Sequence, residues 1–230
     1  MLDKVVQSLE AAVAGIQDGA VVLIGGFGAS GVPTALICAL LEQGAKELTI
    51  VNNNAGNGPR GLSQLIEAGR VRKMICSFAR SSDRKNPNAA AFAEAYRAGK
   101  IELECVPQGT MAERMRAAGA GLGPFFTPTG YGTPLARGKE TRVIDGVGYV
   151  LETPLKGDVA LVKAQRADRW GNLVYRYAGR NFGPVMCMAA KLTIAQVDEI
   201  VPLGAIDPQH VMTPGIFVHR VVQVEDGHGN

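Results

Sequence analysis

The chain has 230 residues, 47% of them apolar and 20% charged, a composition typical of a folded globular protein and not of a disordered one. The formal net charge is only +3, and the basic residues are scattered among acidic ones, which argues against a nucleic-acid-binding protein. The sequence has no run of about 18 apolar residues and no signal-peptide core, so we expect a cytoplasmic protein without a membrane segment.

The four cysteines restrict the function further. They are widely separated, lie in apolar stretches and form no CxxC pair: Cys38, Cys76, Cys105 and Cys187. The three histidines lie toward the C-terminal end of the sequence, away from every cysteine. We therefore expect reduced, buried thiols and no metal site.

The first half of the chain alternates between helices and strands. Apolar residues at helical spacing, from Val5 to Ile16, predict a first amphipathic helix that ends at Asp18 and Gly19. Short apolar runs then predict strands at 20–24, 48–51, 71–76 and 101–106. Helical patterns lie between these strands, at 34–43, 61–68 and 89–98. The alternation predicts an α/β fold with a doubly wound, mostly parallel open sheet.

The second half of the chain has a different pattern of predicted elements. Residues 119–134 are dense in Gly, Pro and Thr and are expected to be irregular, and before them Thr110 and Glu113 have capping-box spacing. Short strands with turns follow, at 142–144, 149–152, 159–163, 172–175, 192–196 and 218–224. No internal repeat is visible. We expect one domain over residues 1–230, with a β-rich C-terminal part.

The most informative segment follows the first predicted strand. This strand stops at Gly25, Gly26, Phe27 and Gly28, and the next helix begins just beyond Pro33. A glycine turn between a strand and a helix N-terminus is expected to present bare backbone N–H groups to an anion or a developing oxyanion.

One interpretation of this glycine turn is a dinucleotide site, because residues 26–31 match the pattern GxGxxG. Such a site needs an acidic residue after the second strand to bind the ribose, and Asn52, Asn53 and Asn54 stand there instead. Amides both donate and accept hydrogen bonds, which suits a carbonyl or carboxylate better than a ribose diol. Nicotinamide-cofactor binding is therefore the less favoured alternative.

The polar ends of three predicted strands are expected to meet. The glycine turn, the asparagines and Gln108 all follow strands, and ligands of such sheets bind beyond the carboxyl ends of the strands. Gln108 is an uncharged donor that can hold an oxyanion but cannot attack a carbonyl. No Ser or Cys stands in a sharp strand-to-helix turn with a companion His, so the sequence offers no nucleophile of this kind. It therefore looks like half of an active site, with oxyanion donors but without the attacking group.

A series of motifs, in order, resembles the family I CoA-transferases. They include Asp18-Gly19, Gly25-Gly26-Phe27, Asn53-Asn54-Ala55-Gly56, Pro107-Gln108-Gly109-Thr110, Thr127-Pro128-Thr129-Gly130-Tyr131-Gly132 and Ala178-Gly179-Arg180-Asn181-Phe182. The resemblance runs from about residue 3 to about residue 222 and is closest to the A subunits of 3-oxoacid CoA-transferases, in particular those that act on 3-oxoadipate.

This resemblance implies a sheet of the CoA-transferase type and a ping-pong transfer of CoA from succinyl-CoA to a 3-oxo acid, with CoA thioesters as substrates and no cofactor. In the family, the nucleophile is a glutamate in a Ser-Glu-Asn-Gly motif of the B subunit, and this chain contains no such motif. The expected partner is therefore a B subunit, in an αβ or α2β2 assembly. The rival from another class is a non-catalytic binding subunit.

By position in the family motifs, Gln108 is the expected donor to the thioester or anhydride oxygen. Asn53 and Asn54 are expected to line the acyl pocket beside it. Two structural alternatives stay open: Gln108 as a partner of the turn backbone, and the asparagines as turn formers in left-handed geometry.

The glycine turn has an expected role of its own in the family. Gly25, Gly26 and Gly28 would let the backbone approach the substrate carboxylate, while Phe27 would wall the pocket or, alternatively, belong to the core.

Two segments leave the substrate open. Residues 79–88 depart from the closest pattern by a short insertion, and Arg80 there is a candidate ligand for the far carboxylate of 3-oxoadipate, with a solvated loop charge as the alternative. Because of this departure, acetoacetate is a second candidate for the acid that accepts CoA. The loop 119–131 is expected either to close over the substrate or to pack as an Ω-loop at the subunit contact.

Overall fold

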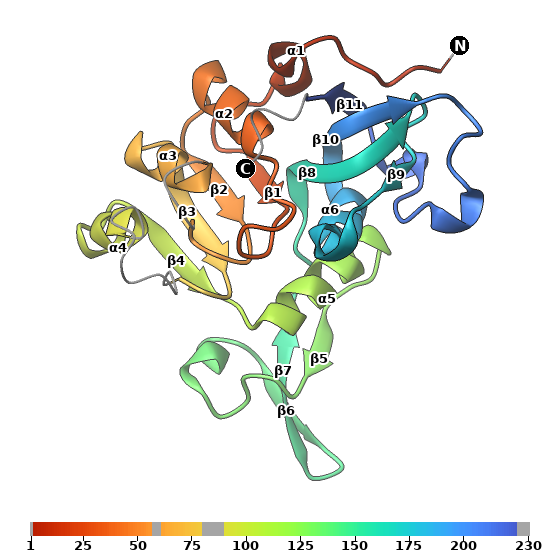
Figure 1. The fold of residues 1–230 in the computed structure, drawn as a ribbon. Helices are drawn as coiled ribbons and strands as arrows, with labels where there is room; N and C mark the ends of the chain where they lie inside the picture. The colour runs from red at the N-terminus through yellow and green to blue at the C-terminus, as the bar shows by residue number, and fades with distance from the viewer. Residues whose placement is uncertain (1, 57–60, 80–89, 225–230) are drawn as a thin grey trace.

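The computed structural model describes residues 2–56, 61–79 and 90–224. Its main element is an eight-stranded sheet with the strand order β11-β10-β8-β1-β2-β3-β4, in which β9 pairs with β8 (Figure 1). All neighbouring strands run parallel except β8 and β9. The strands are β1 (Val21–Ile24), β2 (Leu48–Val51), β3 (Val71–Cys76), β4 (Glu102–Cys105), β8 (Gly157–Asp168), β9 (Leu173–Val174), β10 (Ala190–Val201) and β11 (Arg220–Gln223).

Helices cover both faces of this sheet. One apolar cluster joins one face to α1 (Leu9–Val13), α2 (Thr34–Gln43), α3 (Leu62–Glu67) and α4 (Ala90–Arg97). A second cluster joins the other face to α5 (Gln108–Gly119) and α6 (Gly183–Ala189). Consecutive strand residues alternate between the two clusters, as Ile50 and Val51 do, because successive side chains of a strand point to opposite faces. The doubly wound, mostly parallel sheet is confirmed.

The elements nearest the glycine turn have the predicted bounds. Helix α2 and strands β2 and β3 begin and end at the predicted residues. Gly44 ends α2 in the left-handed conformation, with φ 97°, and its N–H bonds to the Leu40 carbonyl. Local sequence signals were sufficient to predict these bounds, because the glycine stop signal after α2 and the apolar patterns of the two strands mark them clearly.

The first predicted helix is wrong in length. Only Leu9–Val13 is helical, capped by Ser8, whose hydroxyl accepts from the Ala11 N–H at 3.1 Å. Val5 instead forms a parallel bridge to Val221, and the Val6 N–H donates to the Val221 carbonyl at 2.8 Å. The apolar residues before Ser8 thus extend the far edge of the sheet, a tertiary pairing that overrides helical spacing.

The predicted capping box at Thr110 is also wrong. Helix α5 begins at Gln108 after Pro107, so Thr110 lies inside its first turn. Pro107 fixes the backbone and provides no side-chain cap, and the helix starts three residues earlier than a cap at Thr110 would place it.

The C-terminal part is rich in strands, but two of these are longer than predicted. Strands β8 and β10 have 12 residues each and join the main sheet instead of forming a separate region. Helix α6 was not predicted, because Gly183 and Pro184 at its start resemble a stop signal. Pro184 occupies the first turn, where proline is tolerated.

A small antiparallel sheet, β5-β7-β6, projects from the body (Figure 1). Its strands are β5 (Phe125–Thr127), β6 (Thr141–Ile144) and β7 (Val147–Glu152). The prediction that residues 119–134 are irregular is wrong for β5, which lies within them. The Tyr131 ring lies so close to Gly148 that a Cβ added to Gly148 would overlap it. In the part of the chain that the structure describes, no helix is long and apolar enough to span a membrane.

Candidate functional site

The carboxyl ends of β1, β2 and β3 bring the glycine turn and the asparagines together. The Asn52 side-chain amide donates to the Ile24 carbonyl at 2.7 Å, and the Gly28 N–H donates to Asn54 Oδ1 at 3.3 Å. The Phe78 N–H after β3 donates to the Asn53 carbonyl at 3.0 Å. The expected convergence therefore exists for the glycine turn and the asparagines, and the end of β3, which was not predicted to take part, joins them.

The glycine turn is a tight backbone structure in which Gly26 has no room for a side chain. Phe27 and Ser30 exchange two backbone hydrogen bonds of 3.0 Å, which close the turn. Gly26 and Gly28 adopt φ values of 130° and 60°, and a Cβ on Gly26 would lie 2.7 Å from the Val32 side chain. These glycines allow the sharp exit from β1.

The expectation of bare N–H groups in this turn is wrong for its first four residues. The Gly25 N–H donates to the Leu161 carbonyl at 2.9 Å and the Gly26 N–H to Asn181 Oδ1 at 3.0 Å. Phe27 and Gly28 donate to Ser30 and Asn54, as described above. Acceptors from distant segments thus occupy these donors, and a ligand has to bind elsewhere or displace them.

Asn181 connects the turn to the segment before α6, and reasoning from residue types missed its role. Its Oδ1 accepts from the N–H groups of Gly26 and Phe182, and its Nδ2 donates to the Gly179 carbonyl at 2.9 Å and the Ser30 carbonyl at 3.2 Å. Its φ of 24° is a backbone conformation that this network holds. The available signal was the motif Arg180-Asn181-Phe182.

Phe27 is 47% exposed, so the alternative that it belongs to the core is wrong. Phe78, which follows β3, two strands away from β1 in the sheet, is 48% exposed. Two aromatic side chains therefore stand at the rim of the same edge, where they are available to wall a binding site.

Gln108 occupies a separate part of this edge. It is the first residue of α5 and follows β4, which β3 separates from β2 in the sheet. Its side chain is half-buried and has no hydrogen bond to the described residues, so it is not bonded to the turn backbone. The structure does not bring Gln108 into hydrogen-bond contact with the glycine turn or with Asn53 and Asn54.

The start of α5 is the part of the edge that offers free donors. The first N–H groups of a helix have no partner within it, and Pro107 provides no side-chain cap. Three consecutive strand ends also carry buried polar atoms without a partner in the described chain: Asn53 Oδ1, Ser77 Oγ and Thr110 Oγ1. The free N–H groups of α5 and the Ser77 and Thr110 hydroxyls can bind and stabilise an oxyanion, whereas Asn53 Oδ1 only accepts hydrogen bonds.

The expectation of buried thiols holds for Cys76 and Cys187, but Cys38 is half-buried and Cys105, at the end of β4, is exposed. Burial raises the pKa of the Cys76 thiol to about 12, and burial does the same for Cys187. Neither is a thiolate at neutral pH. Among the described residues, no group of three His, Cys, Asp or Glu side chains could hold a metal ion. Arg80 lies outside the described residues.

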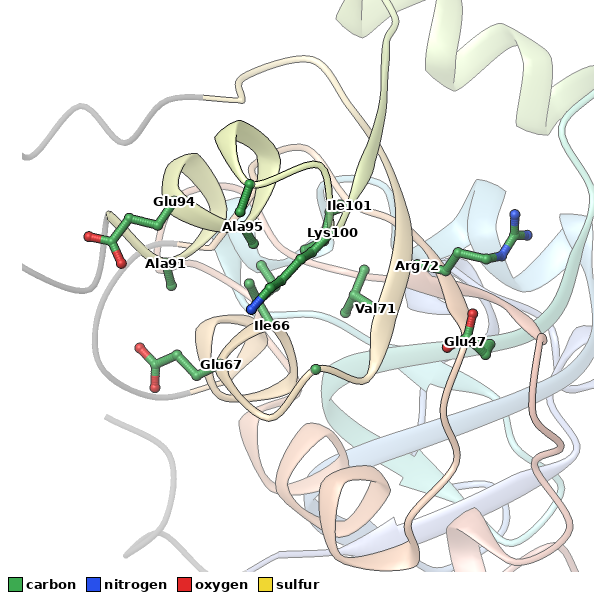
Figure 2. Close-up of a pocket in the computed structure, with 12 residues that line it drawn as sticks. Glu47, Ile66, Glu67, Val71, Arg72, Ala91, Glu94, Ala95, Lys100 and Ile101 are labelled. Carbon is green, nitrogen blue, oxygen red and sulfur yellow. The ribbon is translucent and has the colours of Figure 1, made fainter.

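A groove of about 520 Å³ lies away from this edge (Figure 2). It is lined by residues of α3 and α4 and by Val71 and Ile101, which stand at the beginnings of β3 and β4. Glu67, Glu94 and Lys100 line it as well, without a common focus (Figure 2). It therefore does not belong to the candidate site, which follows the opposite ends of the strands.

Comparison with known proteins relates this edge to a family. The coenzyme A transferase family model matches residues 6–224. The chain is 60% identical to the A subunit of the Pseudomonas putida protein named 3-oxoadipate CoA-transferase, over 97% of this chain and 95% of that one. It is 52% identical to the A subunit of the Xanthomonas campestris protein named succinyl-CoA:3-ketoacid coenzyme A transferase, over 93% of this chain and 86% of that one.

The fold agrees with these similarities. The solved glutaconate coenzyme A-transferase from Acidaminococcus fermentans superposes with a TM-score of 0.83, at 24% identity, over 98% of this chain and 77% of that one. The chain therefore belongs to the coenzyme A transferase family.

Proposed function

We propose that this chain is the A subunit of a CoA-transferase that moves CoA from succinyl-CoA to a 3-oxo acid, with 3-oxoadipate as the acceptor. The observation that carries this proposal is the 60% identity, over nearly the full length of both chains, to the A subunit of a protein named 3-oxoadipate CoA-transferase. The name of that relative also supports a partner, a B subunit, in an αβ or α2β2 assembly.

The proposed reaction needs a carboxylate nucleophile from the B subunit. That glutamate attacks the thioester carbonyl of succinyl-CoA and expels CoA thiolate, which leaves a succinyl–glutamyl anhydride. The thiolate then attacks the glutamyl carbonyl and releases succinate, which leaves a glutamyl–CoA thioester. The carboxylate of the 3-oxo acid repeats these steps in reverse and departs as its CoA thioester. Every step passes through a tetrahedral oxyanion.

In this mechanism, Gln108 donates from its side-chain amide to that oxyanion. Its position at the start of α5, its half-burial and its lack of a protein partner among the described residues support this role. The positive end of the helix adds to the stabilisation of negative charge. One such donor lowers the barrier by about 3–4 kcal/mol.

The acyl part of the substrate lies, in this proposal, against the glycine turn. Gly25, Gly26 and Gly28 allow the close approach, and Phe27 forms a wall, which its exposure supports. Asn53 and Asn54 line the pocket, and Asn53 Oδ1, which has no partner in the described chain, is available to a ligand donor.

The expected place of action is the cytoplasm, in the catabolism of aromatic compounds through 3-oxoadipate. All four cysteines fall within the described part of the chain, and none forms a disulfide, which supports a reducing compartment. The pathway follows from the proposed acceptor alone.

Acetoacetate is the second candidate acceptor, because the Xanthomonas campestris relative is named for 3-ketoacids in general. Kinetics of the reconstituted pair of subunits, with succinyl-CoA and either acid, distinguish the two. We expect the larger kcat/KM for 3-oxoadipate. A larger value for acetoacetate would keep the mechanism and overturn the acceptor.

Arg80 is proposed to bind the far carboxylate of 3-oxoadipate. The variant Arg80→Ala is expected to raise the KM for 3-oxoadipate, by about tenfold or more for a lost charged hydrogen bond, and to leave the KM for acetoacetate unchanged. An unchanged KM for 3-oxoadipate would overturn this role.

A further inference from the structure

We infer that Arg114 is a positioning residue for Gln108, acting through an ion pair with Glu104 that clamps the turn between β4 and α5. Arg114 Nη1 donates to Glu104 Oε1 at 2.7 Å. Glu104 lies on β4 and Arg114 on α5, so the pair closes a loop of chain in which Gln108 stands. The inference rests on the proposed oxyanion role of Gln108.

Other charged and backbone groups hold both ends of this clamp. Lys73 on the neighbouring strand β3 contacts the second oxygen of Glu104 at 2.7 Å. On the other side, Arg114 Nε donates to the Thr153 carbonyl at 2.8 Å, and the Leu155 N–H donates to the Arg114 carbonyl at 2.9 Å. Arg114 therefore connects the edge of the main sheet to the segment that leaves the small sheet.

The Arg114 end of the clamp is more buried than the Glu104 end, whose side chain is 31% exposed. The Arg114 side chain is 9% exposed, and that of Glu152, 3.8 Å away, is 4% exposed. Lys139 neutralises Glu152 through a 2.6 Å contact. A guanidinium with acceptors on several sides and little contact with water has one preferred position, because an alternative position would leave buried charges without partners.

The turn itself has one further directional tie, the hydrogen bond of 3.0 Å from the Val106 N–H to the Cys76 carbonyl. Pro107 provides no cap, Thr110 Oγ1 has no partner in the described chain, and Gln108 has no hydrogen bond to it. Met111 and Met115 anchor the apolar face of α5 but are not directional. The Val106 bond fixes the start of the turn and the Glu104–Arg114 pair fixes its helical end, so the orientation of the Gln108 amide depends on both.

The test is a double-mutant cycle on the complex of this chain with its B subunit. We expect Arg114→Met to lower kcat by about 10- to 100-fold with little change in either KM, because misplacement by about 1 Å costs this much. In the background of Gln108→Ala, the same change is expected to have almost no further effect. Arg114→Lys is expected to recover part of kcat, because it retains the charge.

Controls come from the same helix. Glu113 and Arg116 form an exposed pair with their charged groups 3.1 Å apart, and Arg116→Met is expected to leave kcat unchanged. Where Arg114→Met fails to assemble, Glu104→Gln tests the clamp from its other end, since Glu104 is more exposed and the buried Arg114 keeps an acceptor.

The outcomes are distinguishable. A slow Gln108→Ala enzyme together with an unchanged Arg114→Met enzyme would overturn the clamp and keep the proposed function. Losses that multiply in the double variant would show that Arg114 acts on something other than Gln108, which also overturns the clamp. A normal rate for Gln108→Ala would overturn the oxyanion role first, and the clamp with it.

Discussion

The two turns that carry the candidate site differ in how their backbone donors are used. In the glycine turn, four successive N–H groups already have protein acceptors, and Asn181 locks the turn from a distant segment. At the start of α5, the Gln108 side chain has no partner in the described chain, and an ion pair between β4 and α5 holds the turn in place. The glycine turn, which the sequence marks most clearly, thus has its backbone donors occupied, whereas the start of α5 has donors without a partner in the described chain.

The largest effect is expected at the free donor. Gln108→Ala should lower kcat by about 10²- to 10³-fold while the complex with the B subunit still assembles, because an oxyanion donor is lost. Steady-state kinetics and size-exclusion chromatography measure both. Gln17→Ala, at an exposed position near the opposite edge, is the matched control. A rate within about twofold of the unmodified enzyme would remove the contrast between the turns.

A smaller but clear effect is expected on stability in the glycine turn. A Cβ on Gly31 would overlap the Gly179 carbonyl, at a φ of 70°. Gly31→Ala should therefore reduce the free energy of unfolding by ~2–4 kcal/mol, which lowers Tm by roughly 5–15 °C. Gly138→Ala shares the positive φ but has open space around it, so it should cost only about 1 kcal/mol. Equal losses would show that the two segments are not interlocked.

The contribution of Asn181 should be intermediate. Asn181→Ala leaves the Gly26 N–H and the Ser30 carbonyl without their partner and should cost about 1–3 kcal/mol in a denaturant titration. Asn181→Asp keeps the acceptor for Gly26 and should cost less. If Asn181→Ala slowed the reaction more than Gln108→Ala does, the glycine turn would be the more important catalytic element.

The smallest effect is expected on the pH dependence of stability, through the ion pair between Glu104 and Arg114. Burial alone would raise the pKa of Glu104, but hydrogen bonds from Arg114 and Lys73 outweigh it, so the pKa lies below the ordinary value of 4.5. A carboxyl with a lowered folded-state pKa contributes stability above its unfolded pKa and loses it as pH falls through the folded value.

The difference in Tm between the unmodified protein and Glu104→Gln should therefore be constant near neutral pH and shrink below about pH 4.5. Thermal melts across this range, with Glu113→Gln as the exposed control, measure it. A difference that grows on acidification would contradict the assigned direction of the Glu104 pKa.

Local sequence signals predicted much of the fold. The bounds of α2, β2 and β3 are those predicted, because strong strand patterns and a glycine stop signal act over a few residues. The first helix failed because Val5 pairs with Val221, a contact that no local pattern encodes. Helix α6 was missed because Gly183 and Pro184, which open it, are also the residues that end helices.

The candidate site could likewise be predicted only where local sequence patterns determine it. Glycines and asparagines after the strands correctly predicted which segments meet at one edge. Which N–H groups stay free depends instead on acceptors such as Asn181, 155 residues away in sequence from Gly26. The Glu104–Arg114 clamp was likewise not visible, because both residues have the appearance of ordinary helix and strand charges.

The central claim is that this chain holds the oxyanion donors while a partner holds the nucleophile. The most direct measurement is CoA transfer from succinyl-CoA to 3-oxoadipate, by this chain purified alone and by the chain co-purified with its B subunit. We predict activity only from the pair, and its loss when the glutamate of the partner's Ser-Glu-Asn-Gly motif is replaced by alanine. Transfer by the single chain would contradict the claim, because the nucleophile would then lie in this sequence.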